Sequence, residues 1–386
     1  MRAGLPVALA IAAVLVASAP AEVASGDRRD VSPLLRPILE KHGLPGLAGV
    51  VLRGDSVVAT GAAGLRERGH DEKLAIGDRF HLGSCTKSMT ATLVATLVHE
   101  KKLAWATTIA QVFTDVKMHE DWKAVTLEQL LTNRSGAPGG LDRDGLQMRL
   151  WGIADKPGPV QRRALVEGVL AHAPEAAPGT KFIYSNAGFS IAGAMAERVT
   201  GKAWEDLMRE RIFRPLGMKS AGFGAPGTKT RLDEPRGHRP DGTPVEPGLD
   251  ADNPGAIGPA GTVHCSLEDW ARYVAVHVRL DPDGCGRTPR GAGTLVESLG
   301  GPAVFAKLHA PVGDYAMGWA ITDRDWAGGK TLTHTGSNTM WFCVAWLAPR
   351  KDFAVLIGAN QGGDEAAKAC DEAAWALIQD ERKQWR

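Results

Sequence analysis

The sequence has almost no net charge and few cysteines, and each shortage argues against a class of protein. Its 45 lysines and arginines are balanced by 44 aspartates and glutamates, so no nucleic-acid or polybasic membrane partner is indicated. The cysteines form no Cys-x-x-Cys pair, which argues against zinc or thioredoxin-like chemistry. They are Cys85, Cys265, Cys285, Cys343 and Cys370.

Short motifs for nucleotides and metals are missing as well. The chain has no Walker loop, no His-Glu-x-x-His zinc motif and no Gly-x-Ser-x-Gly elbow around Ser84. Residues 222–227 match the dinucleotide-binding pattern, but they follow no expected strand and contain a proline. Since the 11 histidines are scattered along the chain, we expect neither a cofactor nor a metal ion.

An apolar run from Leu5 to Val16 follows Arg2 and precedes small residues up to Ala21. This pattern is typical of a secretory signal peptide, and the run is too short to span a bilayer. We expect residues 1–22 to be removed and the mature protein to be exported, periplasmic or extracellular, without a membrane span. An uncleaved membrane anchor is the alternative.

Export would permit disulfide bonds. Cys265 and Cys285 are the nearest pair in sequence, but this spacing establishes no pairing. Because the number of cysteines is odd, at least one thiol stays free. We expect it to be Cys85, buried beside Ser84 as a small apolar residue.

Strand patterns lie at both ends of the chain, and helical patterns lie between them. The expected sheet segments are residues 30–80 and 312–386, and residues 95–310 are mainly helical. This order predicts one α/β (α+β) domain over residues 27–386. It would have a central antiparallel sheet from both chain ends, flanked by helices, and a mainly helical insertion. Residues 221–261 are rich in glycine and proline and should form long loops over a site.

Several local features are specific enough to compare with a structure. We expect a hairpin turn at Gly54 and a capping box between Thr126 and Gln129. We also expect a helix over residues 204–213 and a strand over residues 316–321.

The chain is organised around Ser84-Cys85-Thr86-Lys87, which precedes an apolar, alanine-rich helical pattern. At the start of a helix, Ser84 and Lys87 would lie on one face, close enough for their side chains to meet. A buried lysine has a lowered pKa and can take the proton that a serine must lose to become a nucleophile. Taken alone, however, Ser-x-x-Lys is more often a solvated pair.

Two later segments supply partners for this pair. Tyr184 and Asn186 are two residues apart before a helix, so both side chains would point to the same side of an extended loop. A phenol can relay a proton, and an amide can bind a substrate carbonyl. An ordinary Asn helix cap beside a packed Tyr is the alternative interpretation. The other segment, residues 334–338, follows a strand and contains a glycine that would let a substrate come close.

These three segments resemble the signatures Ser-x-x-Lys, Tyr-x-Asn and His-x-Gly of the serine β-lactamase and penicillin-binding protein superfamily. The resemblance covers about residues 30–360 and is nearest to the class C β-lactamase, DD-peptidase and esterase branch. It implies a β-lactamase-like fold and a serine hydrolase that forms an acyl-enzyme on an amide or ester bond. The implied activities are those of a DD-peptidase, D-aminopeptidase, esterase or weak β-lactamase on a small molecule or peptide.

The resemblance also implies a role for each matching position. Ser84 would be the acylated nucleophile. Lys87 and Tyr184 would share the general-base and general-acid work, and which of the two is the base stays open. The backbone N–H groups of Ser84 and Ser337 would form the oxyanion hole. The other substrate-binding residues would be Asn186, His334, Thr335 and Gly336.

One position departs from the class C β-lactamases, which carry lysine where this chain has His334. Because histidine is mostly neutral near pH 7, we expect weak recognition of a carboxylate such as that of penicillins. This recognition should grow as the pH falls from about 8 to 6. The alternative function is a slowly acylating or non-hydrolytic protein that binds or senses peptidoglycan or β-lactams. The sequence does not indicate the oligomeric state.

Overall fold

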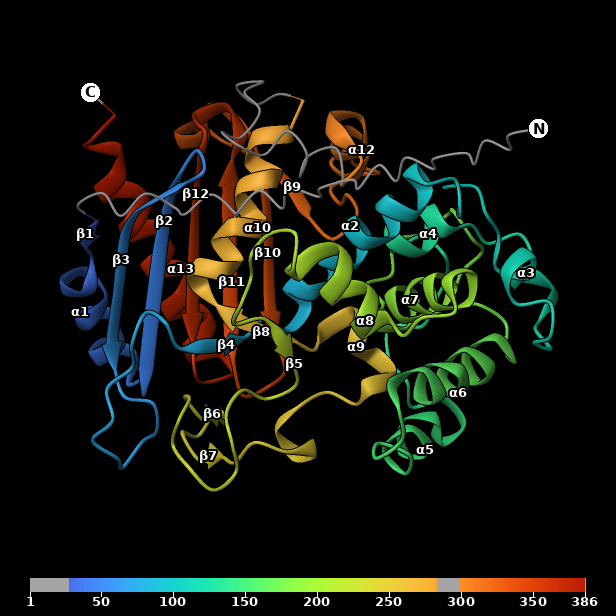
Figure 1. The fold of residues 1–386 in the computed structure, drawn as a ribbon, viewed down its shortest axis with the longest axis horizontal. Helices are drawn as coiled ribbons and strands as arrows, with labels where there is room; N and C mark the ends of the chain where they lie inside the picture. Colours follow the sequence, from blue (N-terminus) through green and yellow to red (C-terminus); the bar gives the residue numbers. More distant parts are fainter. Residues whose placement is uncertain (1–27, 283–298, 386) are drawn as a thin grey trace, which may run out of the picture.

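The computed structural model describes residues 28–282 and 299–385 (Figure 1). The expected signal peptide, residues 1–22, and Cys285 lie outside the described residues. Within the described ranges, no helix is both long enough and apolar enough to cross a membrane.

A central sheet combines strands from both ends of the chain. In sheet order its strands are β1 (Arg29–Asp30), β3 (Ser56–Gly64), β2 (Gly46–Arg53), β12 (Phe353–Ala359), β11 (Phe342–Ala348), β10 (Gly329–Ser337) and β9 (Ala320–Arg324). The two chain ends meet where β2 pairs with β12, blue beside red in Figure 1. All neighbours are antiparallel except β1, which pairs parallel with β3. The predicted architecture of the sheet is confirmed.

Local sequence patterns explain where the central strands lie. β12 is buried at every residue and β2 at nearly every residue, as expected of apolar strands covered on both faces. β3 alternates buried and partly exposed residues, which is typical of a strand with one face more exposed to solvent than the other. Gly54, between β2 and β3, has a φ of +62°, so the predicted hairpin turn is present.

Helices cover both faces of this sheet (Figure 1). On one face lie α1 (Ser32–His42) and α13 (Asp364–Arg382), which form an apolar cluster with the β12 side chains on that side. On the other face lie α10 (Leu267–Leu280) and α2 (Thr86–His99), which belong to the larger core cluster. The sheet is thus the middle layer of three.

The part between the two sheet segments is mainly helical, as predicted. Its further helices are α3 (Ile109–Val112), α4 (Leu127–Leu131), α5 (Leu146–Trp151), α6 (Gly158–Leu170), α7 (Asn186–Thr200), α8 (Trp204–Met208), α9 (Gly258–Gly261) and α12 (Gly301–Leu308). Thr126 caps α4 by accepting a hydrogen bond from the Gln129 backbone, and the Gln129 side chain accepts one from the Thr126 backbone N–H. The capping-box prediction is therefore confirmed.

Two predicted elements differ from the structure. The helix expected over residues 204–213 is α-helical to Met208 and then continues as a π-helix over Arg209–Phe213. The strand expected over residues 316–321 begins at Ala320. Gly318 has a φ of +84°, and a Cβ there would lie 2.5 Å from the Cα of Ser88. This segment therefore turns against α2 before it joins the sheet.

Residues 221–261 form long loops that contain short elements, as expected. β4 (Arg79–His81) pairs with β8 (Val263–Ser266), which also pairs with β5 (Gly222–Phe223). β6 (Gly237–His238) and β7 (Pro244–Val245) pair with each other. Because β4 leads directly into Ser84, this small sheet connects the loops to the segment that carries the serine.

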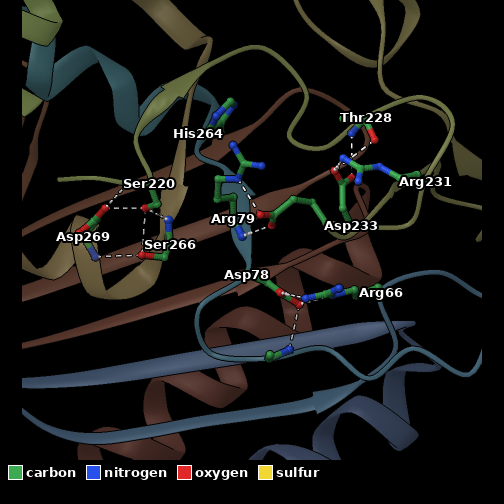
Figure 2. Close-up of polar contacts among 12 residues, drawn as sticks. Arg66, Asp78, Arg79, Ser220, Thr228, Arg231, Asp233, His264, Ser266 and Asp269 are labelled. Carbon is green, nitrogen blue, oxygen red and sulfur yellow. Dashed lines mark hydrogen bonds and ion pairs between the residues drawn. The ribbon is translucent and has the colours of Figure 1, made fainter.

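Polar contacts hold these loops against β4 (Figure 2). The backbone N and the Nε of Arg79 each donate to Glu234 at 2.8 Å. Asp78, the residue before β4, accepts a hydrogen bond from Arg66 Nε at 3.0 Å. Asp233 accepts one from the backbone of Thr228 at 2.9 Å. The contacts between Arg79 and Glu234 therefore hold β4 against the loops, in addition to its pairing with β8.

Candidate active site

Ser84 lies in a 3-10 turn, Gly83–Cys85, that leads into α2. Gly83 has a φ of +49°, and a Cβ there would lie 2.3 Å from the backbone N of Ser337. A Cβ at Gly336 would lie 2.0 Å from the carbonyl oxygen of Leu82. Glycine at both positions lets the turn and the end of β10 approach closely. The backbone N atoms of Ser84 and Ser337 therefore lie close together, where the turn meets the end of β10.

The Lys87 ammonium group is buried and has three hydrogen-bond partners. Nζ lies 3.0 Å from Ser84 Oγ, 2.7 Å from Asn186 Oδ1 and 2.9 Å from the carbonyl oxygen of Ala260. Burial lowers the pKa of Lys87 to about 7, because the charged form loses its hydration. Near neutral pH, a large fraction of this amine is therefore neutral and can accept a proton.

Tyr184 and Asn186 both face Lys87, as their spacing predicts. The α7 cap is Ser185, whose hydroxyl accepts from the Gly188 backbone at 3.1 Å. The side chain of Asn186 is therefore free to bind Lys87, and the interpretation of Asn186 as an ordinary cap is wrong. The Tyr184 ring centroid lies 4.7 Å from Lys87 Nζ. Burial raises the pKa of Tyr184, and a hydrogen bond with the Ser84 side chain opposes the shift.

His334 is buried and neutral. Its Nδ1 donates to the Thr335 carbonyl oxygen at 2.5 Å, so Nε2 is the acceptor and lies 3.3 Å from Tyr315 Oη. Burial, and after it the nearby charge of Lys87, lowers the pKa of His334 to about 4. The prediction that His334 gains charge between pH 8 and 6 is therefore wrong, because the imidazole stays neutral over that whole range.

A pocket of about 680 Å³ opens above Ser84. Its walls at the serine combine the predicted residues Tyr184, His334, Thr335 and Ser337 with two aromatic residues, Phe182 and Tyr315, that the motifs did not identify. Lys87 and Asn186 lie behind Ser84 and do not line this pocket.

Other residues were also missed from the sequence. The carbonyl of Ala260 belongs to a Pro-Ala-Gly segment, and a backbone acceptor gives no side-chain signal. His81 contacts both Asp252 and the backbone of Gly83 in the Ser84 turn, but His81 and Asp252 are 171 residues apart in the chain.

The described cysteines do not form disulfides. Cys85 is a buried free thiol, as predicted, and Cys265, Cys343 and Cys370 are buried free thiols too. Burial raises the pKa of Cys85, so this thiol is not a competing nucleophile beside Ser84. Within residues 28–282 and 299–385, no group of three or more His, Cys, Asp or Glu side chains has the arrangement of a metal site.

The three-layer fold, the buried lysine behind a serine and the glycine-containing strand edge define a class of serine hydrolases with the β-lactamase fold. The family model described as Beta-lactamase matches residues 31–379. The chain therefore belongs to this family.

Two curated relatives are a penicillin-binding protein and a hydrolase. The chain is 27% identical to penicillin-binding protein 4 of Amycolatopsis lactamdurans over 329 residues, which cover 83% of this chain and 82% of that protein. It is 26% identical to an unguisins hydrolase of Aspergillus campestris over 360 residues. This match covers 87% of the chain but 62% of the length of that hydrolase.

Solved structures show the same fold. SurE superposes with a TM-score of 0.71 at 21% identity, over 90% of this chain and 74% of that chain. The octameric penicillin-binding protein homologue from Pyrococcus abyssi superposes with a TM-score of 0.69 at 22% identity, over 89% and 75% of the two chains.

Proposed function

We propose that this protein is an exported serine hydrolase that cleaves esters or amides through an acyl-enzyme on Ser84. The single observation that carries the proposal is the 3.0 Å contact between Lys87 Nζ and Ser84 Oγ, made by a buried amine whose pKa is lowered to about 7. The apolar run at residues 5–16 supports export.

Lys87 acts as the general base in this proposal. The neutral amine takes the proton from Ser84 Oγ, and Oγ forms a bond to the substrate carbonyl carbon. The carbonyl electron pair moves onto oxygen, where the N–H groups of Ser84 and Ser337 stabilise the negative charge. The leaving group departs when the tetrahedral intermediate collapses. Asn186 and the Ala260 carbonyl orient the amine toward Ser84.

Tyr184 carries the proton between Lys87 and the leaving group. Its raised pKa argues against a phenolate that acts as the base, because desolvation at the hydroxyl keeps the phenol protonated although 38% of the residue is exposed. A neutral hydroxyl beside Ser84 can donate a proton to the leaving oxygen or nitrogen and regain one from the Lys87 ammonium. In the second half-reaction, water bonds to the acyl carbon and gives a proton to the Lys87–Tyr184 pair, the bond from Ser84 Oγ to that carbon breaks, and the pair returns the proton to Oγ.

The pocket disfavours anionic acyl groups. His334 is neutral, so the position that carries lysine in class C β-lactamases offers no cation to a substrate carboxylate. Aromatic side chains of Phe182 and Tyr315 line the pocket near the serine. Esterase or aminopeptidase activity is therefore proposed ahead of β-lactamase activity.

Mass spectrometry of the purified protein and of Ser84→Ala tests this proposal. Each protein is incubated separately with a short-chain p-nitrophenyl ester, a penicillin and a D-Ala-D-Ala peptide. We expect rapid release of p-nitrophenol by the wild type and none by Ser84→Ala above the rate in buffer. Turnover that survives Ser84→Ala would refute Ser84 as the nucleophile. A stable adduct without turnover would instead favour a slowly acylating binding protein.

A further inference from the structure

The pocket at Ser84 reaches both faces of the sheet. Along β10, Thr335 and Ser337 point to the face opposite His334 and Gly336, since side chains alternate along a strand. Gly336 faces the serine, because a Cβ there would lie 2.8 Å from Ser84 N. Thr335 and Ser337 nevertheless line the same pocket as Ser84. The pocket therefore passes over the strand and continues on the side of α13.

The outer part of the pocket is apolar apart from one carboxylate. Phe342, Val344 and Trp346 of β11 line it, together with Ala367 of α13. Asp371 lies one helical turn after Ala367 and also lines the pocket. Among the described residues that line this pocket, Asp371 alone carries a formal charge at neutral pH.

Asp371 has no partner of its own. Neighbouring carboxylates on α13 are paired, since Glu365 lies 2.7 Å from Lys368 and Glu372 lies 2.7 Å from Lys41. In the part of the chain that the structure describes, no ion pair or hydrogen bond involves the Asp371 carboxylate. An unpaired carboxylate beside apolar walls is available to a cationic ligand.

One indole ring, that of Trp346, lines the pocket together with this carboxylate. Trp375 follows Asp371 by four residues, on the same face of α13, with 50% of its surface exposed. A carboxylate and indole rings together bind organic ammonium groups by charge and by cation–π attraction. The Trp346 ring already has a cation near it, since the Arg324 guanidinium lies 5.3 Å from the ring centroid.

We propose that the outer part of the pocket is a subsite for an ammonium group, centred on Asp371. The substrate class is then an ester or amide whose reacting carbonyl sits at Ser84 and whose extended apolar chain ends in a positive charge. This inference rests on the proposed function for the position of the reacting carbonyl. The subsite itself depends on Asp371 and Trp346, which line the same pocket.

A matched pair of esters tests the subsite by turnover. One is the p-nitrophenyl ester of trimethylammoniohexanoic acid, and the other is its uncharged tert-butyl analogue of the same shape. We expect the wild type to favour the cationic ester by about fivefold in kcat/KM, the upper end for an ion pair with an exposed carboxylate such as Asp371. In Asp371→Asn this ratio should fall to about one. Asp364→Asn, on the same helix but outside the pocket, should keep the wild-type ratio.

Binding of hexyltrimethylammonium, measured by calorimetry, separates the subsite from the catalytic proposal. We expect Ser84→Ala to bind this cation like the wild type and Asp371→Asn to bind it several-fold more weakly. Equal binding by the wild type and Asp371→Asn would overturn the subsite, even if Ser84 proves to be the nucleophile. A preference of the wild type for a carboxylate-terminated ester would overturn it too. Cation binding that depends on Asp371, in a wild type that turns over neither ester, would instead count against the proposed function and leave the subsite standing.

Discussion

Nε2 of His81 lies 2.6 Å from Oδ1 of Asp252, and this partly buried contact connects the long loops to the turn that carries the serine. Nδ1 of the same ring lies 3.1 Å from the backbone N of Gly83. Because that N–H can act as a donor alone, Nδ1 is the acceptor, and Nε2 carries the proton that is donated to Asp252. Gly83 has a φ of +49°. The pair therefore supports the conformation that presents Ser84.

Asp252→Ala is expected to lower kcat ten- to a hundredfold with a smaller change in KM. His81 would lose its orienting partner and the Ser84 turn would shift, while the pocket walls would stay in place. Asp252→Asn should recover most of the activity, because an amide oxygen can still accept from Nε2–H. Asp250→Asn, an exposed neighbour on the same loop, is the control. An increase in KM alone would argue that Asp252 shapes the pocket instead.

The activity on a neutral ester should fall as the pH drops below about 7. Lys87 has to be neutral to accept the Ser84 proton, and burial lowers its pKa to about 7. Below that value the neutral fraction falls tenfold per pH unit, and above about 8 the profile should be level. The pH dependence of kcat/KM, which reports on the free enzyme, measures this directly.

Tyr184→Phe separates the two candidate bases. This variant should lose activity but keep the same acid limb, since Lys87 is unchanged. If the limb near pH 7 disappears in Tyr184→Phe, the tyrosine and not the lysine controls it. A level profile for the wild type between pH 6 and 8 would contradict the role of Lys87 as the base.

Gly336→Ala should abolish turnover and lower the free energy of unfolding. The added Cβ would lie 2.0 Å from the Leu82 carbonyl oxygen and 2.8 Å from Ser84 N, so β10 and the turn would have to separate. Overpacking of this kind costs about 1–3 kcal/mol. Gly152→Ala is the matched control, because its Cβ would approach no atom closer than 3.4 Å. Urea denaturation and ester assays on both variants check the prediction, which fails if Gly336→Ala stays active.

The sheet was predictable because strand patterns are local. Apolar runs and the turn at Gly54 identify β2, β3 and β12 without knowledge of their partners. Gly318 is different: it looks like part of a strand, but its backbone has to turn because α2 lies against it. The motifs around Ser84, Tyr184 and His334 gave most of the site for the same reason, since each is a short segment with its own pattern.

The rest of the site depends on contacts between distant segments. Ser185 and Asn186 are both good helix caps, and the choice between them is visible only when Asn186 meets Lys87. The pKa of His334 depends on burial and on the charge of Lys87. Asp371 enters the pocket because α13 packs against the same face of the sheet that Thr335 faces. None of these relationships leaves a signal in spacing or composition.

The relative turnover of anionic and neutral esters should be constant between pH 8 and 6. The lowered pKa of His334, about 4, means that no charge appears on the imidazole in this range. His334→Lys should raise the anionic-to-neutral ratio about tenfold, because hydrogen bonds to charged groups contribute about 1.5–3 kcal/mol. Parallel kcat/KM measurements on a carboxylate-terminated and an uncharged ester check both statements. An anionic preference that grows toward pH 6 in the wild type would contradict them.

The free energy of unfolding should fall as the pH drops from about 6.5 toward 5. Burial lowers the pKa of five histidines, and these are His238, His264, His277, His309 and His334. In the unfolded chain each takes up a proton near pH 6.5, whereas the folded protein keeps it neutral to a lower pH, about 4 for His264 and His334. The unfolded state therefore binds more protons in this window and gains relative stability as the pH falls.

His42 acts in the opposite direction, since hydrogen bonds with Glu372 and Glu365 raise its pKa. It is outnumbered by the five buried histidines, each of which contributes up to about 1.4 kcal/mol per pH unit below 6.5. Urea titrations at pH 7.5 and 5.5 should therefore show a clear loss of stability at the lower pH. His277→Gln should reduce that loss, because one buried proton-binding group is removed, and the exposed control His70→Gln should leave it unchanged. A stability that is equal at both pH values would show that these imidazoles are protonated inside the folded protein, and the neutral state assigned to His334 would then have to be abandoned.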